Sequence, residues 1–318
     1  MNGDILQVRN LRVHYHTPRG AVQAVNGVTF SLKAGERFGL AGESGSGKST
    51  VALALMRLIK PPGRIEEGEI WLDGTNLLEL PDEQMRQMRL AAIALVAQGA
   101  MNSLNPVLRV RDQIADALRD HNADVPASKF ATLVDDLLQR VGLRREVAAM
   151  FPHELSGGMK QRVCIAIAIS LRPKVIVADE PTSALDVVVQ RQVMDTLQAV
   201  QEQLGAAVIL IGHDMGLMAQ VVQRVGVMYA GSLVEVCAVG DMFREPLHPY
   251  SRLLIASLPS LERKGALRGI PGLPPSLLNR PLGCPFRPRC PHAMTRCEVE
   301  DPPLREVRPD RWVACHLY

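Results

Sequence analysis

The sequence has no long hydrophobic run. Crossing a bilayer takes about 20 consecutive apolar residues, and the longest runs here, such as residues 163–171, are only about nine residues long. The first ten residues include an acid, Asp4, and have no apolar core of the kind that a secretory signal needs. We therefore expect a cytoplasmic chain without a membrane span, which would serve a membrane only through a partner.

Charge of one sign is not in large excess either. Lysine and arginine number 36, against 33 aspartates and glutamates, which gives a net charge of +3. So small an excess excludes the broad basic surface typical of proteins that bind nucleic acid. The hydrophobic fraction of 47% and the charged fraction of 22% are those of a globular protein. They exclude a disordered chain and a collagen-like repeat.

Proline is scarce in the first three quarters of the chain and common afterwards. Thirteen of the 22 prolines follow residue 240. Because proline lacks a backbone donor and restricts φ, this last part cannot consist of long helices or central strands. We therefore predict two domains, residues 1–240 and an irregular C-terminal extension over residues 241–318.

Residues 1–240 alternate apolar, β-rich runs with helical patterns. The predicted strands cover residues 22–32, 37–41, 69–72, 92–97, 174–178, 207–211 and 225–229. The predicted helices cover residues 49–58, 128–141, 157–171 and 187–204. This alternation favours an α/β fold with a largely parallel sheet that helices cover on both faces.

A glycine-rich segment at residues 42–49, here called the phosphate loop, reads GESGSGKS and matches the pattern G-x-x-x-x-G-K-[ST]. It follows a predicted strand and begins a predicted helix, a context that favours phosphate binding over a plain surface turn. Its backbone N–H groups and the helix dipole favour an anion. Lys48 would reach the β- and γ-phosphates, and the Ser49 hydroxyl would bind Mg²⁺. The predicted ATP-binding residues here are Gly42, Ser44, Gly45, Ser46, Gly47, Lys48, Ser49 and Thr50.

Two acids, Asp179 and Glu180, follow a predicted apolar strand. Carboxylates at the end of a buried strand are unfavourable without a cation, and a solvated turn is the alternative. Together with a phosphate site, Asp179 would hold Mg²⁺, through water, and Glu180 would polarise the attacking water as a general base.

A second glycine-rich helix start, here called the signature segment, reads LSGGMKQR at residues 155–162. Ser156 can cap a helix that begins with two glycines, which leaves N–H groups and a positive dipole directed at an anion. The phosphate loop, Gln98, this segment, the two acids, SALD at residues 183–186 and His213 follow one another in order. In this order the chain resembles the ATP-binding cassette (ABC) ATPases, whose signature LSGGQ it matches except at Met159.

The resemblance implies an ABC ATPase fold with an antiparallel β subdomain and an α-helical subdomain. It also implies that two subunits enclose two ATP molecules head to tail. Ser156, Gly157 and Gly158 would then bind the nucleotide of the opposite subunit, and Asp186 would communicate across the dimer. An ordinary helix-start turn is the alternative for the glycines.

Three further residues match positions with known roles in this family. Gln98 would contact Mg²⁺ or the attacking water and sense the membrane subunit. His213 would contact the γ-phosphate, although a lone histidine is usually structural or exposed. Tyr15 would stack on adenine, and a packed strand residue is the alternative.

Cysteines cluster at the end of the chain, with the spacing C-x₅-C-x₆-C-x₁₇-C. In a reducing cytosol such a cluster binds metal more often than it forms disulfides. The spacing fits neither the ferredoxin patterns nor the short zinc knuckles, so an iron–sulfur cluster and zinc both stay open. His292 and His316 could substitute in a zinc site, although a position beside the ligands or in solvent is the favoured alternative for each. The predicted metal ligands are Cys284, Cys290, Cys297 and Cys315.

Segments of the extension, at residues 248–250, 270–275 and 283–286, resemble the C-terminal extension of dipeptide and oligopeptide importer ATPases. This resemblance implies a 4Fe–4S cluster on the four cysteines, with a structural or redox-sensing role. It also implies a subunit at the cytoplasmic face of the membrane that powers an importer. Its partners would be a second ATPase subunit, identical or related, two transmembrane permease subunits and, indirectly, a solute-binding protein. Peptides, nickel chelates, glutathione and short oligosaccharides are all solutes of this branch.

Other classes of ABC protein fit the sequence less well. DNA-repair and chromosome-structure ATPases insert a long coiled coil before the signature, but only 105 residues separate Ser49 from Leu155, without sustained heptads. A catalytically silent cassette would have lost Glu180 or His213. An exporter half would carry its own membrane helices.

Overall fold

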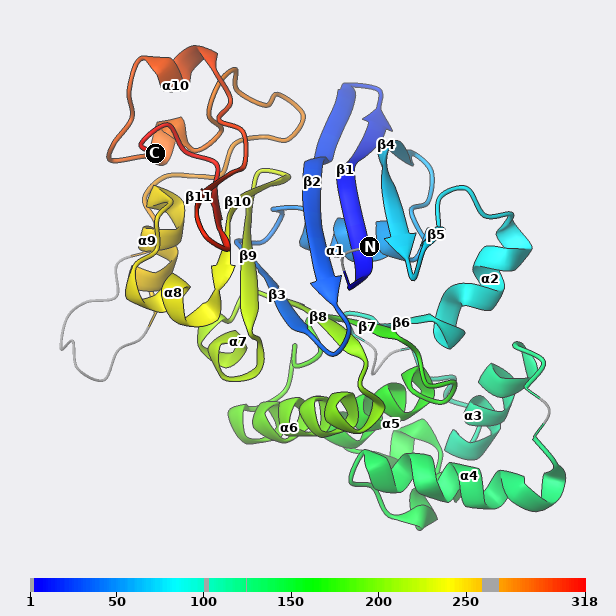
Figure 1. Cartoon of the computed structure of the whole chain (residues 1–318). Helices are drawn as coiled ribbons and strands as arrows, with labels where there is room; N and C mark the ends of the chain where they lie inside the picture. The colour runs from blue at the N-terminus through cyan, green and yellow to red at the C-terminus, as the bar shows by residue number, and fades with distance from the viewer. Residues whose placement is uncertain (1–2, 100–102, 124, 259–268) are drawn as a thin grey trace. The chain divides into compact units, whose positions relative to one another are not determined.

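The structure, a computed structural model, describes residues 3–99, 103–123, 125–258 and 269–318. The chain divides into two compact units, and Figure 1 labels most of their helices and strands. The first unit comprises Met1–Ile5, Lys33–Glu36 and Glu79–Ile209. The second comprises Leu6–Leu32, Arg37–Leu78 and Leu210–Tyr318. Each unit therefore combines segments that are far apart in the sequence.

The strands of the first unit are short and buried. β6 (Ile93–Val96) pairs in parallel with β7 (Val175–Asp179), with Ile93 opposite Val175. Every residue of β7 is buried. A third strand, β8 (Ala207–Gly212), begins in this unit and ends in the second. Continuous apolar runs of this kind are typical of parallel strands covered on both faces, as the sequence predicts here.

Helices make up most of the first unit. They are α2 (Asp82–Ala91), α3 (Val110–Arg119), α4 (Ala127–Arg140), α5 (Gly157–Ala168) and α6 (Val187–Leu204), with short 3₁₀ turns at Arg145–Ala149 and Pro152–Glu154. α5 packs on β6, and α3, α4 and α6 pack on α5. Within the described part of the chain, no helix is both long and apolar enough to span a bilayer.

The second unit contains an antiparallel sheet, in the order β2-β1-β4-β5. Its strands are β1 (Asp4–Thr17), β2 (Gly20–Lys33), β4 (Gly63–Leu72) and β5 (Thr75–Asn76). The sequence predictions missed β1. Its apolar alternation is interrupted at Asn10, which has a φ of +46°, and the register with β4 shifts between Arg9 and Arg12. Such a bulge hides the period of two that identifies a strand.

The second unit also holds the strands that carry the phosphate loop and the extension. β3 (Arg37–Ala41) pairs in parallel with β9 (Arg224–Tyr229), which pairs antiparallel with β10 (Ser232–Ala238). From the extension, β12 (Arg311–Val313) pairs with β10, and β11 (Arg305–Arg308) with β12, both antiparallel. The pairing in this unit is therefore mixed. The helices are α1 (Lys48–Leu55), α7 (Met215–Val221), α8 (Val239–Arg244), α9 (Pro249–Ala256) and α10 (Arg296–Val299).

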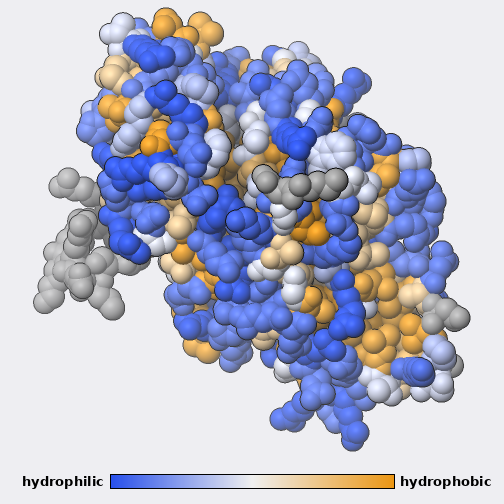
Figure 2. All heavy atoms as spheres, in the orientation of Figure 1, coloured by the Kyte–Doolittle hydropathy of each residue, from blue (hydrophilic) through white to orange (hydrophobic). Residues whose placement is uncertain are grey.

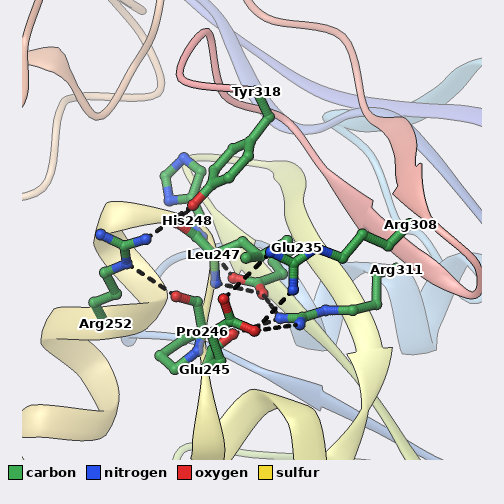
Figure 3. A network of polar contacts seen from close by, with 9 residues as sticks. All are labelled: Glu235, Glu245, Pro246, Leu247, His248, Arg252, Arg308, Arg311 and Tyr318. Atoms are coloured by element: carbon green, nitrogen blue, oxygen red, sulfur yellow. Dashed lines mark hydrogen bonds and ion pairs between the residues drawn. The ribbon is translucent and has the colours of Figure 1, made fainter.

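A buried acid on β10 anchors the start of the extension (Figure 3). The Glu235 carboxylate accepts the backbone N–H groups of Leu247 and His248, both at 2.8 Å. Arg311 of β12 lies 3.7 Å from the same carboxylate. Burial raises the pKa of Glu235, and the two backbone donors and Arg311 act against that rise. Hydrogen bonds to Glu235 thus hold the start of this proline-rich segment. The prediction that the extension has no central strand is wrong for the three-residue β12, which pairs with β10 on one side and with β11 on the other.

Candidate functional site

The phosphate loop, between β3 and α1, has glycines where no side chain fits. Gly42 and Gly47 have φ values of +149° and +102°, a region that residues with a side chain rarely adopt. A Cβ on Gly42 would overlap the carbonyl oxygen of Met228, and one on Gly47 would overlap that of Ala24. Gly45, at the exposed tip, has a φ of +77° and open space around it. The neighbouring backbone therefore determines the path of the loop.

Lys48 begins α1 and points back into the loop. Its Nζ atom donates to the carbonyl oxygens of Gly42 and Glu43, each at 2.9 Å, and to Ser46 Oγ at 3.3 Å. The residue is only 5% exposed. This ammonium group adds its charge to the positive end of the α1 dipole, so the loop is suited to bind an anion.

Two other predicted residues, Tyr15 and His213, belong to the second unit. The Tyr15 ring lies over Gly63 of the paired strand β4, where an added Cβ would be 2.7 Å from Tyr15 Cε1. This contact fits a packed strand residue, and stacking of Tyr15 on adenine stays a prediction. His213 is exposed directly after β8 and precedes Asp214, which caps α7 by accepting the N–H of Leu217 at 2.9 Å.

The first unit brings together two predicted residues that are 82 positions apart. Gln98 Nε2 donates to Glu180 Oε2 at 3.0 Å. Gln98 follows β6 and Glu180 follows β7, so the parallel pairing of these strands places both side chains at one sheet edge. Asp179, the last residue of β7, is buried and directly precedes Glu180 in the sequence. Carboxylate and amide oxygens are the protein ligands that Mg²⁺ prefers, so this donor set fits the predicted ion.

The signature segment begins α5 as the sequence predicts. Ser156 is the N-cap of the helix, and its Oγ accepts the N–H of Met159 at 3.3 Å. Gly158 faces the start of α6, where a Cβ would overlap a methyl group of Val189. Gly157, the first helical residue, is half-buried and Ser156 is exposed. The structure thus confirms the predicted cap and places the starts of α5 and α6 side by side.

Asp186 has a local role in the structure. It is the N-cap of α6, and its carboxylate accepts the N–H groups of Val188 and Val189 at 3.1 and 3.0 Å. Val187 and Val188, the first residues of this helix, are both exposed. The role of Asp186 across a dimer stays a prediction.

The predicted four-cysteine metal site is not supported by the structure. Among the residues described, no group of three or more histidine, cysteine, aspartate or glutamate side chains could hold a metal ion. Burial raises the pKa of the Cys284 thiol to about 11 and also raises those of Cys290 and Cys315. Aromatic packing also contributes to holding the extension, since the Phe286 and Tyr229 ring centroids are 5.1 Å apart.

The two histidines considered as possible substitutes in a zinc site have other neighbours. His316 Nε2 lies 2.9 Å from the carbonyl oxygen of Glu300. The backbone N–H of His292 donates to Cys290 Sγ at 3.4 Å. Neither contact makes a zinc ligand set, because neither joins the imidazole to a second potential ligand.

Three residues at the phosphate loop lie outside the predicted set. They are Glu43 of the loop itself and Tyr250 and Arg289 of the extension, and both extension residues bond to Glu43. The only sequence signal was an acid inside an anion-binding loop, which requires a cation nearby.

The fold and the motifs agree with known ATP-binding cassettes. The dimeric post-hydrolysis structure of the ATP-binding cassette MJ0796, bound to ADP and Pi, matches with a TM-score of 0.65 and 26% identity, covering 74% of this chain and 98% of that one. The family described as "ABC transporter" matches residues 25–183. The chain belongs to the ABC transporter family of ATP-binding proteins, as the motifs indicate.

Further likeness extends over almost the whole chain. The family described as "Oligopeptide/dipeptide transporter, C-terminal region" matches residues 234–297. The oligopeptide transport ATP-binding protein OppD of Salmonella typhimurium is 45% identical over 314 residues, covering 98% of this chain and 93% of that protein. The dipeptide transport ATP-binding protein DppD of Haemophilus influenzae is 42% identical over 316 residues, covering 98% and 95%.

Proposed function

We propose that this chain is the ATP-hydrolysing subunit of an importer for oligopeptides or dipeptides. One observation carries the proposal. A phosphate loop with a buried lysine occurs in the same chain as a C-terminal region of the oligopeptide/dipeptide transporter family. The named relatives, which match from end to end, support the peptide solute. Residues 241–318 are the extension in this proposal, and residues 1–240 the cassette.

ATP hydrolysis in this proposal depends mainly on position and charge. The phosphate loop and Lys48 bind the phosphates, and the Ser49 hydroxyl and Asp179 would hold Mg²⁺, which would supply positive charge beside the phosphates. Glu180 accepts the proton of the attacking water, and the 3.0 Å hydrogen bond from Gln98 orients that carboxylate. His213 contacts the γ-phosphate, and Tyr15 contacts adenine.

We infer that a second ATPase subunit completes each nucleotide site. The support is an exposed serine cap with glycines behind it on α5, and the dimeric cassette with bound ADP and Pi that this fold resembles. Mixing inactive Lys48→Ala and Ser156→Arg copies tests this. If the site is shared, mixed dimers carry one intact site and recover part of the hydrolysis. No recovery despite mixed dimers in native mass spectra would contradict a shared site.

The membrane partners are the permease subunits of the importer, and the place of the chain is the cytoplasmic face of the membrane. Hydrophobic residues gather over α3 on the face shown in Figure 2. Val107, just before α3, is 75% exposed. We expect this surface to contact a permease subunit, so Val107→Asp should abolish co-purification with the permeases and keep basal ATP hydrolysis.

Reconstitution tests the importer and its solute together. The chain would be co-expressed with the permeases and the solute-binding protein from neighbouring genes and placed in liposomes. Peptides should stimulate hydrolysis and accumulate inside. Stimulation by a nickel chelate, glutathione or an oligosaccharide alone would support those solutes instead. Hydrolysis that neither the permeases nor any of these solutes changes would favour an ABC ATPase that does not transport.

The metal site of the extension is a separate proposal, on which no step of hydrolysis depends. Burial is the main cause of the raised pKa values of Cys315 and Cys284; Cys290 and Cys297 add to the rise at Cys315, and Cys297 adds to the rise at Cys284. The four thiols therefore share one electrostatic neighbourhood. Anaerobically purified protein that is brown and contains iron would support 4Fe–4S, and colourless protein with zinc would support zinc. Protein without either metal would contradict both.

A further inference from the structure

The phosphate loop contains an acid that plays no part in the roles above. Glu43 follows the first glycine of the loop and is 28% exposed at its side chain. Arg289 of the extension donates to both of its carboxylate oxygens, with Nη1 to Oε2 at 2.6 Å and Nη2 to Oε1 at 3.0 Å. The Arg289 side chain is only 3% exposed. Bidentate, charge-assisted pairs of this kind are among the strongest hydrogen-bonded contacts in proteins.

The guanidinium of Arg289 is held on its other sides as well. Its Nε donates to the carbonyl oxygen of Pro271 at 2.8 Å, and Nη2 also reaches that of Ile270 at 3.3 Å. Nη1 also reaches the hydroxyl of Tyr229 at 3.4 Å. Since a guanidinium has five N–H donors, every donor of Arg289 has an acceptor. The carboxylate of Glu43 raises the pKa of Arg289, so the guanidinium keeps its charge.

A second residue of the extension binds the backbone at the same position. The N–H of Glu43 donates to the Tyr250 hydroxyl at 2.9 Å. Tyr250 is fully buried, and its ring lies 4.6 Å from that of Tyr229 and 5.4 Å from that of Phe286. The extension therefore contacts both the side chain and the main chain of one residue in the phosphate loop.

We propose that Arg289 is a positioning residue for nucleotide binding, which neutralises Glu43 and fixes it away from the phosphates. Without Arg289, the loop would present a free carboxylate next to a polyphosphate, and like charges repel. The inference rests on the proposed function, because it requires that the loop bind ATP. It makes the extension part of the nucleotide site as well as an appendage of the fold.

The test measures the Kd of Mg·ATP on the full-length chain by calorimetry, with thermal unfolding in the absence of nucleotide beside it. Arg289→Met should weaken binding about tenfold, and Arg289→Lys less, because lysine keeps the charge but not the bidentate geometry. The double variant Glu43→Gln/Arg289→Met should bind more tightly than Arg289→Met, since no carboxylate remains. The matched control is Arg296→Met, which removes an exposed ion pair with Glu300 in the same extension and should bind like the wild type.

A purely structural role for Arg289 predicts a different order of Mg·ATP affinities among the variants. In that case the double variant would bind as weakly as Arg289→Met or more weakly, and the inference would be wrong. Equal binding by Arg289→Met and the wild type would also overturn it. The weakening in Arg289→Met should shrink as salt rises, because salt screens the repulsion.

Two further measurements of the Kd of Mg·ATP, on Glu43→Gln and on the wild type, complete the test. If Arg289→Met does not fold, Glu43→Gln alone still decides, since removing the carboxylate should leave the Kd within about twofold of the wild type or tighten it. A large loss of affinity in that variant would contradict charge neutralisation. Failure of the wild type itself to bind Mg·ATP would instead refute the proposed function.

Discussion

Two helices of this protein begin at glycine-rich segments, and their N-termini are built differently. At α1 the N-cap is Gly47, which has no side chain, and Lys48 is buried among the carbonyls of the loop. At α5 the N-cap is the exposed Ser156, whose hydroxyl caps its own helix. The N-terminus of α1 therefore has both a cation, Lys48, and a loop whose glycines leave backbone N–H groups for an anion. The N-terminus of α5 offers a capped helix end, which suits a site that another subunit completes.

Loss of the proposed general base, Glu180, should have the largest effect on ATP turnover. It tests whether the chain hydrolyses ATP, which both helix ends would serve. We expect Glu180→Gln to lower turnover by about 10²- to 10⁴-fold, because glutamine cannot accept the proton of the attacking water. Binding of ATP should persist, since the amide oxygen can still accept the hydrogen bond from Gln98. Steady-state hydrolysis and the Kd of ATP check this, with Glu202→Gln on α6 as the control. Normal turnover in Glu180→Gln would refute the assigned role.

Alanine at individual glycines should separate the two helix starts. Gly47→Ala puts a Cβ against a fixed carbonyl at positive φ, so we expect loss of ATP binding and roughly 2–3 kcal/mol of unfolding free energy. Gly45→Ala, at positive φ in open space, should cost only about 1 kcal/mol. Gly158→Ala meets the side chain of Val189, which can move, and should also cost less than Gly47→Ala. Chemical denaturation measures all three. Equal costs at Gly158 and Gly47 would remove the distinction between the two starts.

Substitutions of Ser156 should distinguish capping from phosphate contact. Ser156→Ala loses the cap, at about 1 kcal/mol of unfolding free energy. Ser156→Asp keeps a good cap but places a negative charge where the γ-phosphate of the other subunit would lie. It should therefore unfold like the wild type, bind ATP like the wild type and hydrolyse it at least about tenfold more slowly. Normal hydrolysis by Ser156→Asp would show that the helix end does not approach a phosphate.

The last prediction concerns the pH dependence of stability, through a histidine that supports the contact of the extension with the phosphate loop. Burial lowers the pKa of His248 to about 3, so below an unfolded value near 6.5 the unfolded chain binds a proton that the folded chain does not. Stability then falls as the pH falls, by about 2 kcal/mol between pH 6.5 and pH 5. His248 caps α9 by accepting the N–H of Tyr250. His248→Asn keeps an acceptor there and should lose this pH dependence.

Denaturation of both forms at pH 7.5 and pH 5 measures the difference. The comparison isolates His248 from Glu235, whose raised pKa acts with the opposite sign as pH changes. An identical pH dependence in both forms would contradict the assignment.

The local motifs were predictable from sequence, and the distant contacts were not. Ser156 caps α5 because a serine precedes two glycines, and the glycines of the phosphate loop adopt positive φ, both within a few residues. By contrast, β1 was missed because a bulge interrupts its alternation. The cysteines were expected to form a metal site from their proximity in sequence, yet proximity in sequence does not bring thiols into one coordination geometry.

Family, fold class and the chemistry of the phosphate loop followed from the sequence alone, because a short motif restricts its own backbone and its own charges. The pairing of Gln98 with Glu180 and of Glu43 with Arg289 came only from the tertiary structure. The first pair is separated by 82 positions and the second by 246. Each pair meets only after the strands have paired and the extension has packed. No local pattern encodes which distant charge will neutralise a given acid, because that choice depends on how the whole chain buries its surface.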